Sequence, residues 1–399
     1  MLQNSYFFKS ISQKLSSFIQ FKASISSLKV VWRKDPNLDE AIENDKQWRL
    51  CARVVREVLN EPGQVICVKY LEKRRKRMGL NLSINVFLSR NPGLFDVYSG
   101  RIRPKSNLVP FIRPSERVSR YLEMRDLVYR KNEGLIVSKL CKLLMMSRDN
   151  VVSSDKLLEV KREFGFPDDF LVNLVPRYPG CFRLVGCPGE GQSYLELVEW
   201  NDECAKSVIE LRAEEESRKM GVRVRPAFNW KLPPGFFYRK EMREWVRDWM
   251  ELPYISPYED ASKLDPASGE AEKRMVGVFH ELLSLSLYKR ITIDVLGKFC
   301  EDYSYSNAFS NAFTRHSGLF YVSLKGGVRT AMLREAYKGN ELIDRDPLLE
   351  INEKFIELLA EGHKQWAENS KLQREMIQKD MESMAMKKTE LDLDDNEEC

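Results

Sequence analysis

The densest group of chemically active side chains in this sequence is a run of five cations from Lys73 to Arg77. Between Gln64 and Arg130 the chain carries fifteen Lys and Arg residues and five acids, a local net charge of +10, whereas the whole chain carries +5. Lysine and arginine attract phosphates, so this stretch is typical of a polyanion-binding surface, with a solvated surface as the alternative. The candidate contacts in it are Lys73, Arg74, Arg75, Lys76, Arg77, Arg90, Arg101, Arg103, Lys105 and Arg113.

Three aromatic residues, Tyr70, Tyr98 and Phe111, lie among these cations in the sequence. Single-stranded RNA is recognised by stacking of its bases on aromatic rings or guanidinium planes, while cations neutralise its phosphates. If the ligand is RNA, these three rings are therefore candidates for stacking on its bases. For each ring taken alone, packing in the core is the favoured interpretation, and stacking on a base is the alternative.

The sequence lacks the patterns that organise common catalytic and cofactor sites. It contains no Walker loop, no G-x-G-x-x-G, no G-x-S-x-G and no H-E-x-x-H. The eight cysteines form no C-x-x-C pair and there are only three histidines, so no zinc-finger spacing is present. We expect no catalytic residue, cofactor, metal or small-molecule substrate, with a cysteine-dependent hydrolase as the enzymatic alternative. No apolar run approaches the length of a membrane span, so no membrane partner is expected.

A short phrase, Arg-x-Pro/Ser-Gly-x-Phe, occurs three times, at 90–95, 177–182 and 315–320. An internal repeat defines the building block of a fold. The glycine in each copy is expected at a positive φ that ends a helix, and the phenylalanine is expected to pack back on the helices. The arginines, Arg90, Arg177 and Arg315, have two open interpretations: a cation that complements a helix C-terminus, or a phosphate contact repeated in every unit.

The residues around each phrase predict two helices and a β-hairpin. In the second copy, capping residues 153–155 open a helix that Gly165 stops, a second helix covers 168–175, and strands follow at 182–185 and 194–198. The first copy predicts helices at 65–78 and 82–90 and strands at 94–98 and 109–112. The third predicts helices at 291–303 and 306–315 and strands at 320–324 and from 328 onward. This outline is that of a winged-helix-like unit.

The predicted fold class is α+β, predominantly helical, with three such units at about 64–130, 150–215 and 285–340. A Trp-rich helical segment, 225–262, joins the second unit to the third. Its residues Met242, Trp245, Val246 and Trp249 are spaced as one helical face. That spacing favours a core stripe over a platform for bases.

The two ends of the chain differ from its body. Residues 1–34 contain eight serines, five lysines, one arginine and no acid, and 1–30 is predicted to be an organellar transit peptide. Its amphipathic pattern favours the mitochondrion, with the chloroplast stroma as the alternative. Residues 341–399 are predicted to form a C-terminal helix that ends in a disordered tail, whose last eleven residues include six acids.

Several separated motifs resemble the plant organelle RNA recognition (PORR) family, the WHAT'S THIS FACTOR proteins. The resemblance rests on Trp32 to Asp39, Tyr70 to Arg75, Phe87 to Phe95, Leu252 to Tyr254 with Ser256 to Tyr258, and Ala312 to Val322. It implies an RNA-binding domain over 31–340, import into an organelle, and support of group II intron splicing. The family has no catalytic motif to transfer.

Group II intron RNA is therefore the expected partner, with other organellar splicing factors as further partners in a ribonucleoprotein. The intron RNA itself would supply the chemistry, while the protein neutralises phosphates and holds single strands. The alternative function is a protein-interaction scaffold in an organellar ribonucleoprotein complex, in which association with RNA is indirect.

Overall fold

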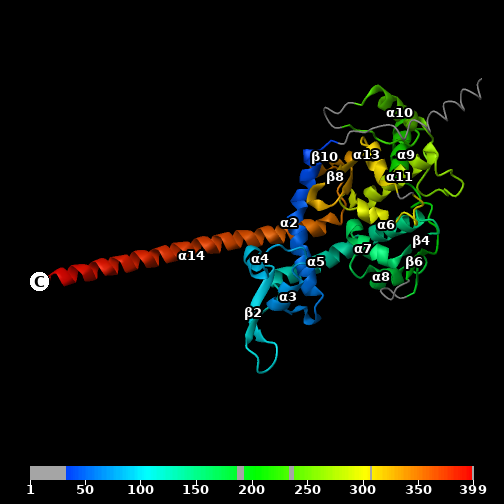
Figure 1. The fold of residues 1–399 in the computed structure, drawn as a ribbon. Coiled ribbons are helices and arrows are strands. Elements are labelled where there is room, and N and C mark those ends of the chain that lie inside the picture. The colour runs from blue at the N-terminus through cyan, green and yellow to red at the C-terminus, as the bar shows by residue number, and fades with distance from the viewer. Residues whose placement is uncertain (1–32, 187–192, 233–237, 306–307, 398–399) are drawn as a thin grey trace, which may run out of the picture. The chain divides into compact units, whose positions relative to one another are not determined.

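The computed structural model describes residues 33–186, 193–232, 238–305 and 308–397, with side chains through residue 384 (Figure 1). The predicted transit peptide and most of the connection between the strands predicted at 182–185 and 194–198 lie outside these residues. The described chain divides into two compact units. Unit 1 comprises the chain up to Glu43 together with Asn132–Pro347, and unit 2 comprises Asn44–Lys131 together with the chain from Leu348 onward.

The fold is α+β, with helices more extensive than strands, as predicted. The strands form three small three-stranded sheets and one two-stranded sheet, all antiparallel. Unit 2 contains most of α2 (Pro36–Leu59), η1 (Pro62–Gln64), β1 (Ile66–Cys67), α3 (Val68–Arg74), α4 (Ile84–Arg90), β2 (Phe95–Arg101), β3 (Leu108–Pro114), α5 (Glu116–Lys131) and α14 (Leu349–Glu397).

Unit 1 contains the other two three-stranded sheets. Its elements are α6 (Glu133–Met145), β4 (Val151–Ser153), α7 (Ser154–Phe164), α8 (Phe170–Asn173), η2 (Val175–Arg177), β5 (Phe182–Val185), β6 (Tyr194–Leu197), α9 (Val208–Met220), α10 (Lys240–Glu251), α11 (Gly269–Leu285), β7 (Arg290–Thr292), α12 (Ile293–Gly297), α13 (Ser310–Arg315), β8 (Phe320–Ser323), η3 (Lys325–Gly327), β9 (Thr330–Leu333), η4 (Arg334–Ala336), β10 (Tyr337–Lys338) and β11 (Glu341–Leu342).

The same chain order, strand, helix, helix and two further strands, occurs three times. In each sheet the short leading strand pairs with the last strand, in the orders β1-β3-β2, β4-β6-β5 and β7-β9-β8. The three predicted hairpins are confirmed. The leading strands were missed, because two or three residues show no periodicity. A non-glycine residue of positive φ lies just before each one: Gln64 (56°), Asn150 (56°) and Lys289 (51°).

Two helix predictions were too long. The helix expected over 65–78 is β1 followed by α3, which ends at Arg74. The helix expected over 291–303 is β7 followed by α12, which ends at Gly297. Each segment has an Ile in its leading strand: Ile66 pairs with Ile112, and Ile291 pairs with Ala331. Pairing with a partner strand overrides a local helical pattern, because the partner lies far away in the sequence.

The repeated phrase adopts one backbone conformation at the residue after its arginine. The φ and ψ angles are −125° and 63° at Asn91, −122° and 58° at Tyr178, and −93° and 50° at His316. This residue caps the helix in each copy. Gly93 has the predicted positive φ of 85°, but the prediction was wrong for Gly180 and Gly318, which have none. The chain has already left the helix one residue after the arginine.

The phenylalanine of each phrase is buried, as predicted: Phe95, Phe182 and Phe320 are exposed to 9%, 3% and 1%. The N–H of Phe182 donates to the carbonyl of Tyr178 at 3.0 Å, and that of Phe320 donates to the carbonyl of His316 at the same distance. Each phenylalanine is therefore the first residue of its strand, and its ring packs against the preceding helices.

Unit 2 is built around one hydrophobic cluster. It includes Val54 and Val58 of α2, Leu71 of α3, Phe87 of α4 and Phe355 of α14. The ring of Phe355 lies 5.2 Å from that of Tyr121 in α5, between centroids. The predicted C-terminal helix thus serves as a core element in its first turns. The disorder predicted for its acidic end stays a prediction.

The Trp-rich segment is a core stripe in unit 1, as predicted. Met242, Trp245 and Trp249 on α10 are buried, with Trp249 fully so. The rings of Trp245 and Trp249 lie 5.4 and 4.4 Å from the ring of His316, between centroids. The segment therefore packs on the third copy of the phrase.

Gly318 allows this packing at close range. A Cβ placed on Gly318 would lie 2.1 Å from Nε1 of Trp230, whose ring also packs against those of Trp249 and Tyr238. We predict that G318A lowers the free energy of unfolding by about 1–3 kcal/mol, because the indole is held on several sides and cannot move away.

The matched control is G180A, since nothing lies within 4 Å of a Cβ at that equivalent position. Its effect should stay within about 0.5 kcal/mol. Urea unfolding followed by tryptophan fluorescence measures both. Equal stability of the two variants would contradict the proposed reason for glycine at 318.

Candidate nucleic-acid interface

The β2–β3 hairpin carries four of the predicted RNA contacts, Arg101, Arg103, Lys105 and Arg113, and all four are exposed. It pairs over seven residues in each strand, from Phe95 opposite Pro114 to Arg101 opposite Leu108, and extends beyond the helices of unit 2 (Figure 1). Side chains alternate across a strand. On one face Phe95 and Ile112 are buried in the core. The opposite face is available for a ligand.

That outer face carries two stacked aromatic rings, which we call the aromatic platform. Tyr98 and Phe111 lie opposite each other, with ring centroids 5.9 Å apart and ring planes 20° apart. Tyr98 is 41% exposed. A Cβ at Gly100 would lie 2.9 Å from Cδ2 of Phe111, so glycine at this position lets the Phe111 ring pack directly on the backbone. Stacked rings with an exposed face can accept a nucleic-acid base.

Cations surround the aromatic platform. The guanidinium carbon of Arg113 lies 5.9 Å from the centre of the Tyr98 ring, and Nε of Arg113 lies 3.4 Å from a carboxylate oxygen of Asp96. At the tip of the hairpin, Arg101, Arg103 and Lys105 are exposed. Arg101 donates to the carbonyl of Pro104 at 3.0 Å. Within the described chain, none of these three forms an ion pair, so their charge is available to a ligand.

The structure divides the run from Lys73 to Arg77 into two groups. Arg74 and Arg77 both form ion pairs with Glu57, Arg74 also with Glu61, and Arg75 with Glu72. Lys73 and Lys76 are exposed and have no carboxylate partner in the part of unit 2 that is described. The ammonium of Lys73 lies 5.7 Å from the centre of the exposed Tyr70 ring. The two lysines are therefore the freer members of the run.

The three arginines of the repeated phrase differ in their surroundings. Arg90 is exposed in unit 2 and forms no ion pair among the described residues. In unit 1, Arg177 pairs with Glu133 at 2.8 Å and donates through Nε to the carbonyl of Asn173. That second contact fits the helix-terminus interpretation. Arg315 pairs with the largely buried Glu272, which also accepts from Nε2 of His316 at 3.2 Å.

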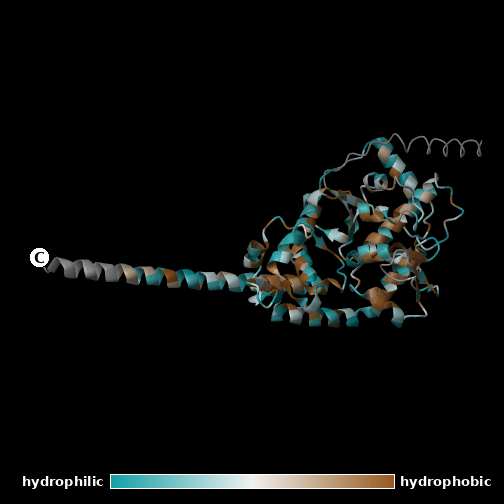
Figure 2. Ribbon diagram, turned by 60° about the horizontal axis from the view of Figure 1, so that its bottom comes forward, coloured by the Kyte–Doolittle hydropathy of each residue, from teal (hydrophilic) through white to brown (hydrophobic). Residues whose placement is uncertain are grey.

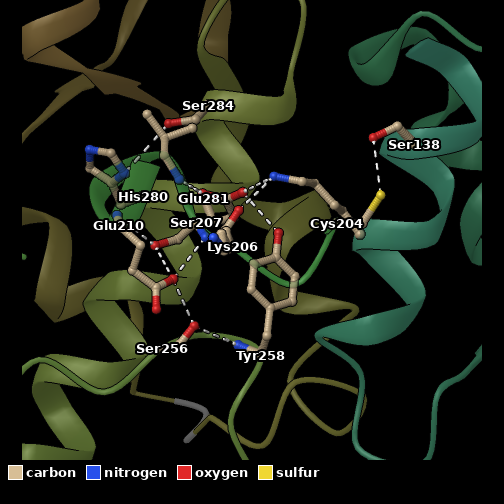
Figure 3. Close-up of polar contacts among 12 residues, drawn as sticks. Ser138, Cys204, Lys206, Ser207, Glu210, Ser256, Tyr258, His280, Glu281 and Ser284 are labelled. Carbon is tan, nitrogen blue, oxygen red and sulfur yellow. Dashed lines mark hydrogen bonds and ion pairs between the residues drawn. The ribbon is translucent and has the colours of Figure 1, made fainter. Parts of the chain in front are cut away.

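A group of hydrogen-bonded polar side chains, most of them buried, lies inside unit 1 (Figure 3). Glu281 on α11 is fully buried and accepts from Nζ of Lys142 at 3.2 Å, the hydroxyl of Tyr258 at 2.8 Å and the N–H of Val208 at 2.8 Å. A buried carboxylate is tolerated only when such donors satisfy it. The site is therefore structural.

Neighbouring residues extend this group. Ser207 and Glu210 form a capping box at the start of α9, and Glu210 also accepts from Ser256 at 2.9 Å. Tyr254 and Ser207 share a hydrogen bond of 2.8 Å. Tyr254, Ser256 and Tyr258 belong to motifs on which the family resemblance rests, and here they hold helices together.

The first motif of the resemblance is also structural. Asp35 pairs with Arg334 at 2.8 Å, and Asp39 accepts from the hydroxyls of Tyr321 at 2.9 Å and Ser323 at 2.5 Å. Asp39 is nearly fully buried. The motif therefore attaches the first turns of α2 to the third sheet within unit 1. Sequence similarity alone does not distinguish such residues from ligand contacts.

Other kinds of site are not found in the described residues. No group of three or more His, Cys, Asp or Glu side chains could hold a metal ion there. No helix among them is long and apolar enough to cross a membrane. The exposed hairpin with its aromatic platform and cations is thus the strongest candidate site, and it has the character of a nucleic-acid-binding surface.

The comparisons with known proteins agree with that class. The chain belongs to the family described as Plant organelle RNA recognition domain, which matches residues 33–364. The predicted family membership is confirmed. The chain is 36% identical over 353 residues to "Protein WHAT'S THIS FACTOR 1 homolog, chloroplastic" of Oryza sativa subsp. japonica, covering 85% of this chain and 67% of that protein.

Two further relatives come from Arabidopsis thaliana. The chain is 29% identical over 345 residues to "Protein ROOT PRIMORDIUM DEFECTIVE 1", covering 82% of each. It is 28% identical over 353 residues to "Protein WHAT'S THIS FACTOR 9, mitochondrial", covering 88% of this chain and 90% of that protein. No solved structure matches the chain.

One buried carboxylate in unit 1 makes the stability pH-dependent. Glu335 accepts two hydrogen bonds from Arg212, at 2.7 and 3.0 Å, and lies 2.6 Å from Nε2 of His280. Burial opposes ionisation, but the hydrogen bonds of His280 and Arg212 outweigh it and lower the pKa of Glu335 from 4.5 to about 2. A carboxylate with a lowered pKa stabilises the fold above its unfolded pKa and loses that contribution as the pH falls toward the folded pKa.

We predict that E335Q lowers the free energy of unfolding by about 2–3 kcal/mol at pH 7, and that the difference from the unmodified chain disappears between about pH 4.5 and 2. The control E357Q removes an exposed partner of Lys354 and should change stability by less than about 0.5 kcal/mol. Tryptophan fluorescence in urea at stepped pH measures this. If the free energy of unfolding of E335Q and of the unmodified chain changed with pH in parallel, Glu335 would be excluded as the source of the pH dependence.

Proposed function

We propose that this chain is an organellar RNA-binding protein that promotes splicing of group II introns by binding and folding intron RNA. The observation that carries the proposal is the exposed hairpin, with the stacked Tyr98 and Phe111 and unpaired cations at its tip. Membership of the Plant organelle RNA recognition domain family supports it. The relatives named as chloroplastic or mitochondrial support it as well.

In this proposal each of the three repeats is a winged-helix-like unit, and the β2–β3 hairpin is the wing of the first. The domain assignment is proposed as predicted, with RNA-binding sequence over about 31–340. The recurrent strand order supports the interpretation of the three repeats as winged-helix-like units. The first wing differs from the others in length, since its strands have seven residues each and those of the other two hairpins have four.

The protein would act on RNA by electrostatics and stacking. Cations at the hairpin tip would neutralise phosphates where RNA helices approach each other, which lowers their mutual repulsion. The aromatic platform would hold an unpaired base, and so keep a single strand from forming incorrect pairs. The folded intron, a ribozyme, would carry out both transesterifications with its own RNA.

We also propose that the chain itself is not an enzyme. Two of the buried thiols are poorly suited to the attack that a cysteine-dependent hydrolase requires, because burial raises the pKa of Cys51 to about 11 and that of Cys141 to about 12. A thiol with such a pKa is almost entirely protonated at neutral pH, and the thiolate is the nucleophile. The proposal includes that the chain binds RNA without a cofactor and without a small-molecule substrate.

A protein-interaction scaffold is the second candidate function, and helix α14 favours it. Beyond its packed first turns, α14 exposes Leu372, Met376, Ile377, Met381 and Met384. Figure 2 shows hydrophobic and hydrophilic stretches alternating along this helix. An exposed helix with several apolar residues could dock a partner helix, such as one from another splicing factor.

The test is immunoprecipitation of the tagged protein from purified mitochondria and purified chloroplasts, followed by sequencing of the bound RNA. We expect sharp enrichment of a few intron-containing transcripts in one organelle, with the mitochondrion as the first expectation. Uniform coverage in both, with partner proteins retained after nuclease treatment, would favour the scaffold instead.

A substitution at the aromatic platform tests the binding mechanism. We predict that Y98A weakens binding of a single-stranded RNA by about 1–3 kcal/mol, roughly 5- to 150-fold, because one stacked base loses its platform. The salt dependence of binding should stay the same, since no charge is removed. Fluorescence anisotropy over a salt series measures both quantities.

The matched control is Y194A, which removes an exposed tyrosine from the hairpin of the second repeat. It should leave the affinity within about twofold, because a surface substitution remote from the site changes little. Equal losses for Y98A and Y194A would remove the special role of the first hairpin.

A further inference from the structure

A second basic stretch lies in unit 1, outside the twelve residues predicted as RNA contacts. From Ser217 to Lys240 the sequence contains seven Lys and Arg residues and no acid. They are Arg218, Lys219, Arg223, Arg225, Lys231, Arg239 and Lys240. All seven are exposed. Such a run without an acid is a strong local source of positive potential.

The part from Arg223 to Lys231 is ordered without being a helix or strand, and we call it the strap. Its exposure alternates along the chain. Val224, Pro226, Phe228 and Trp230 are buried or half-buried, whereas the residues between them are exposed. Alternation with a period of two is the pattern of an extended chain with one side against a core. The outer side consists of Arg223, Arg225, Ala227, Asn229 and Lys231.

The inner side holds the strap in place at several points. Phe228 is 3% exposed, and its ring lies 5.4 Å from that of Trp249 and 5.9 Å from that of His280, between centroids. At the two ends, the N–H of Val224 donates to Oγ of Ser217 at 2.8 Å, and the N–H of Lys231 donates to the carbonyl of Gly318 at 2.9 Å. A backbone fixed in this way loses little conformational entropy when a ligand binds.

The outer cations of the strap have no polar partner among the residues that the structure describes. In the described part of unit 1, the side chains of Arg223, Arg225 and Lys231 form neither an ion pair nor a hydrogen bond. Arg223 and Arg225 point to the same side of an extended chain, roughly 7 Å apart along it. Unpaired cations at regular intervals on an anchored backbone suit a ligand that repeats its negative charge, which is the nature of a phosphate backbone.

We propose that the strap is a second RNA-binding surface, which contacts the sugar–phosphate backbone without reading the bases. The proposal rests on the proposed RNA-binding function. It differs from the hairpin in chemistry, because the outer side of the strap contains no aromatic residue that could stack a base. An acidic protein segment is less favoured as a ligand, because Ala227 is the only apolar residue on that side and gives a docked peptide little surface to bury.

The test compares three triple variants of the full chain after removal of residues 1–30. The first, R223Q/R225Q/K231Q, neutralises the strap. The second, K219Q/K240Q/R247Q, removes the same charge from neighbouring residues that each have a carboxylate near, at Glu215, Glu244 and Asp248. The third, R101Q/R103Q/K105Q, neutralises the tip of the hairpin in unit 2. Circular dichroism confirms that each variant is folded.

Binding is measured by fluorescence anisotropy with two single-stranded RNAs of unrelated sequence, over a series of salt concentrations. We expect the strap variant to reduce the slope of log K against log salt by about 2, since each lost phosphate contact removes about 0.7. The loss of affinity should be equal for the two RNAs. The paired-cation variant should change the slope by less than half as much, and R223K/R225K should retain the slope of the unmodified chain.

Several outcomes would overturn the proposal that the strap binds RNA. An unchanged slope in the folded strap variant, while the hairpin-tip variant loses slope, would reject the strap and leave the proposed function intact. Equal losses of slope for the strap variant and the paired-cation variant would show that the effect comes from net charge alone. Binding of a fluorescent polyglutamate peptide that depends on the strap, with unchanged RNA binding, would assign the surface to an acidic protein. No RNA binding by the unmodified chain would reject both proposals.

Discussion

Burial of carboxylates in unit 1 is the constraint on which the rest of its structure depends. A buried carboxylate is costly unless donors satisfy it, so each one determines which elements must meet. Glu281 brings α11 together with α6, α9 and the segment that contains Tyr258. Asp39 connects the start of α2 to the third sheet, and Glu335 connects α9 and α11 to the end of that sheet.

This use of acids has a consequence for the surface. Carboxylates that are paired inside the fold contribute little to the potential outside it, whereas several cations remain exposed and unpaired. The modest net charge of +5 therefore understates how positive the exposed hairpin tip and the strap are. Attraction for a polyanion results from this separation more than from the overall excess of Lys and Arg.

The three repeats share one chain order but serve different purposes. All of the β8 and β9 residues are buried, and Tyr321 and Met332 in these strands pack against Leu38 and Ala41 of α2. The third hairpin is therefore a core element. The first hairpin is longer and has exposed positions on both strands. The same topology thus gives one hairpin that lies in the core and another that is exposed to solvent.

Local patterns in the sequence were sufficient for much of this fold. The hairpins, the end of α7 at Gly165, the core stripe of α10 and the family were all predictable, because turn residues, periodic apolar positions and motifs act over short distances. The excess of cations between Gln64 and Arg130 was equally visible.

The tertiary structure decided what depends on distant partners. The leading strands form only because β3, β6 and β9 lie beside them, and Gly318 is required by Trp230 rather than by its own φ. Which cations are free follows from carboxylates elsewhere in the chain, since Glu57 engages Arg74 and Arg77 but leaves Lys73 and Lys76 unpaired. The strap has no regular secondary structure, so its contacts with Ser217, Trp249, His280 and Gly318 give it a defined outer side.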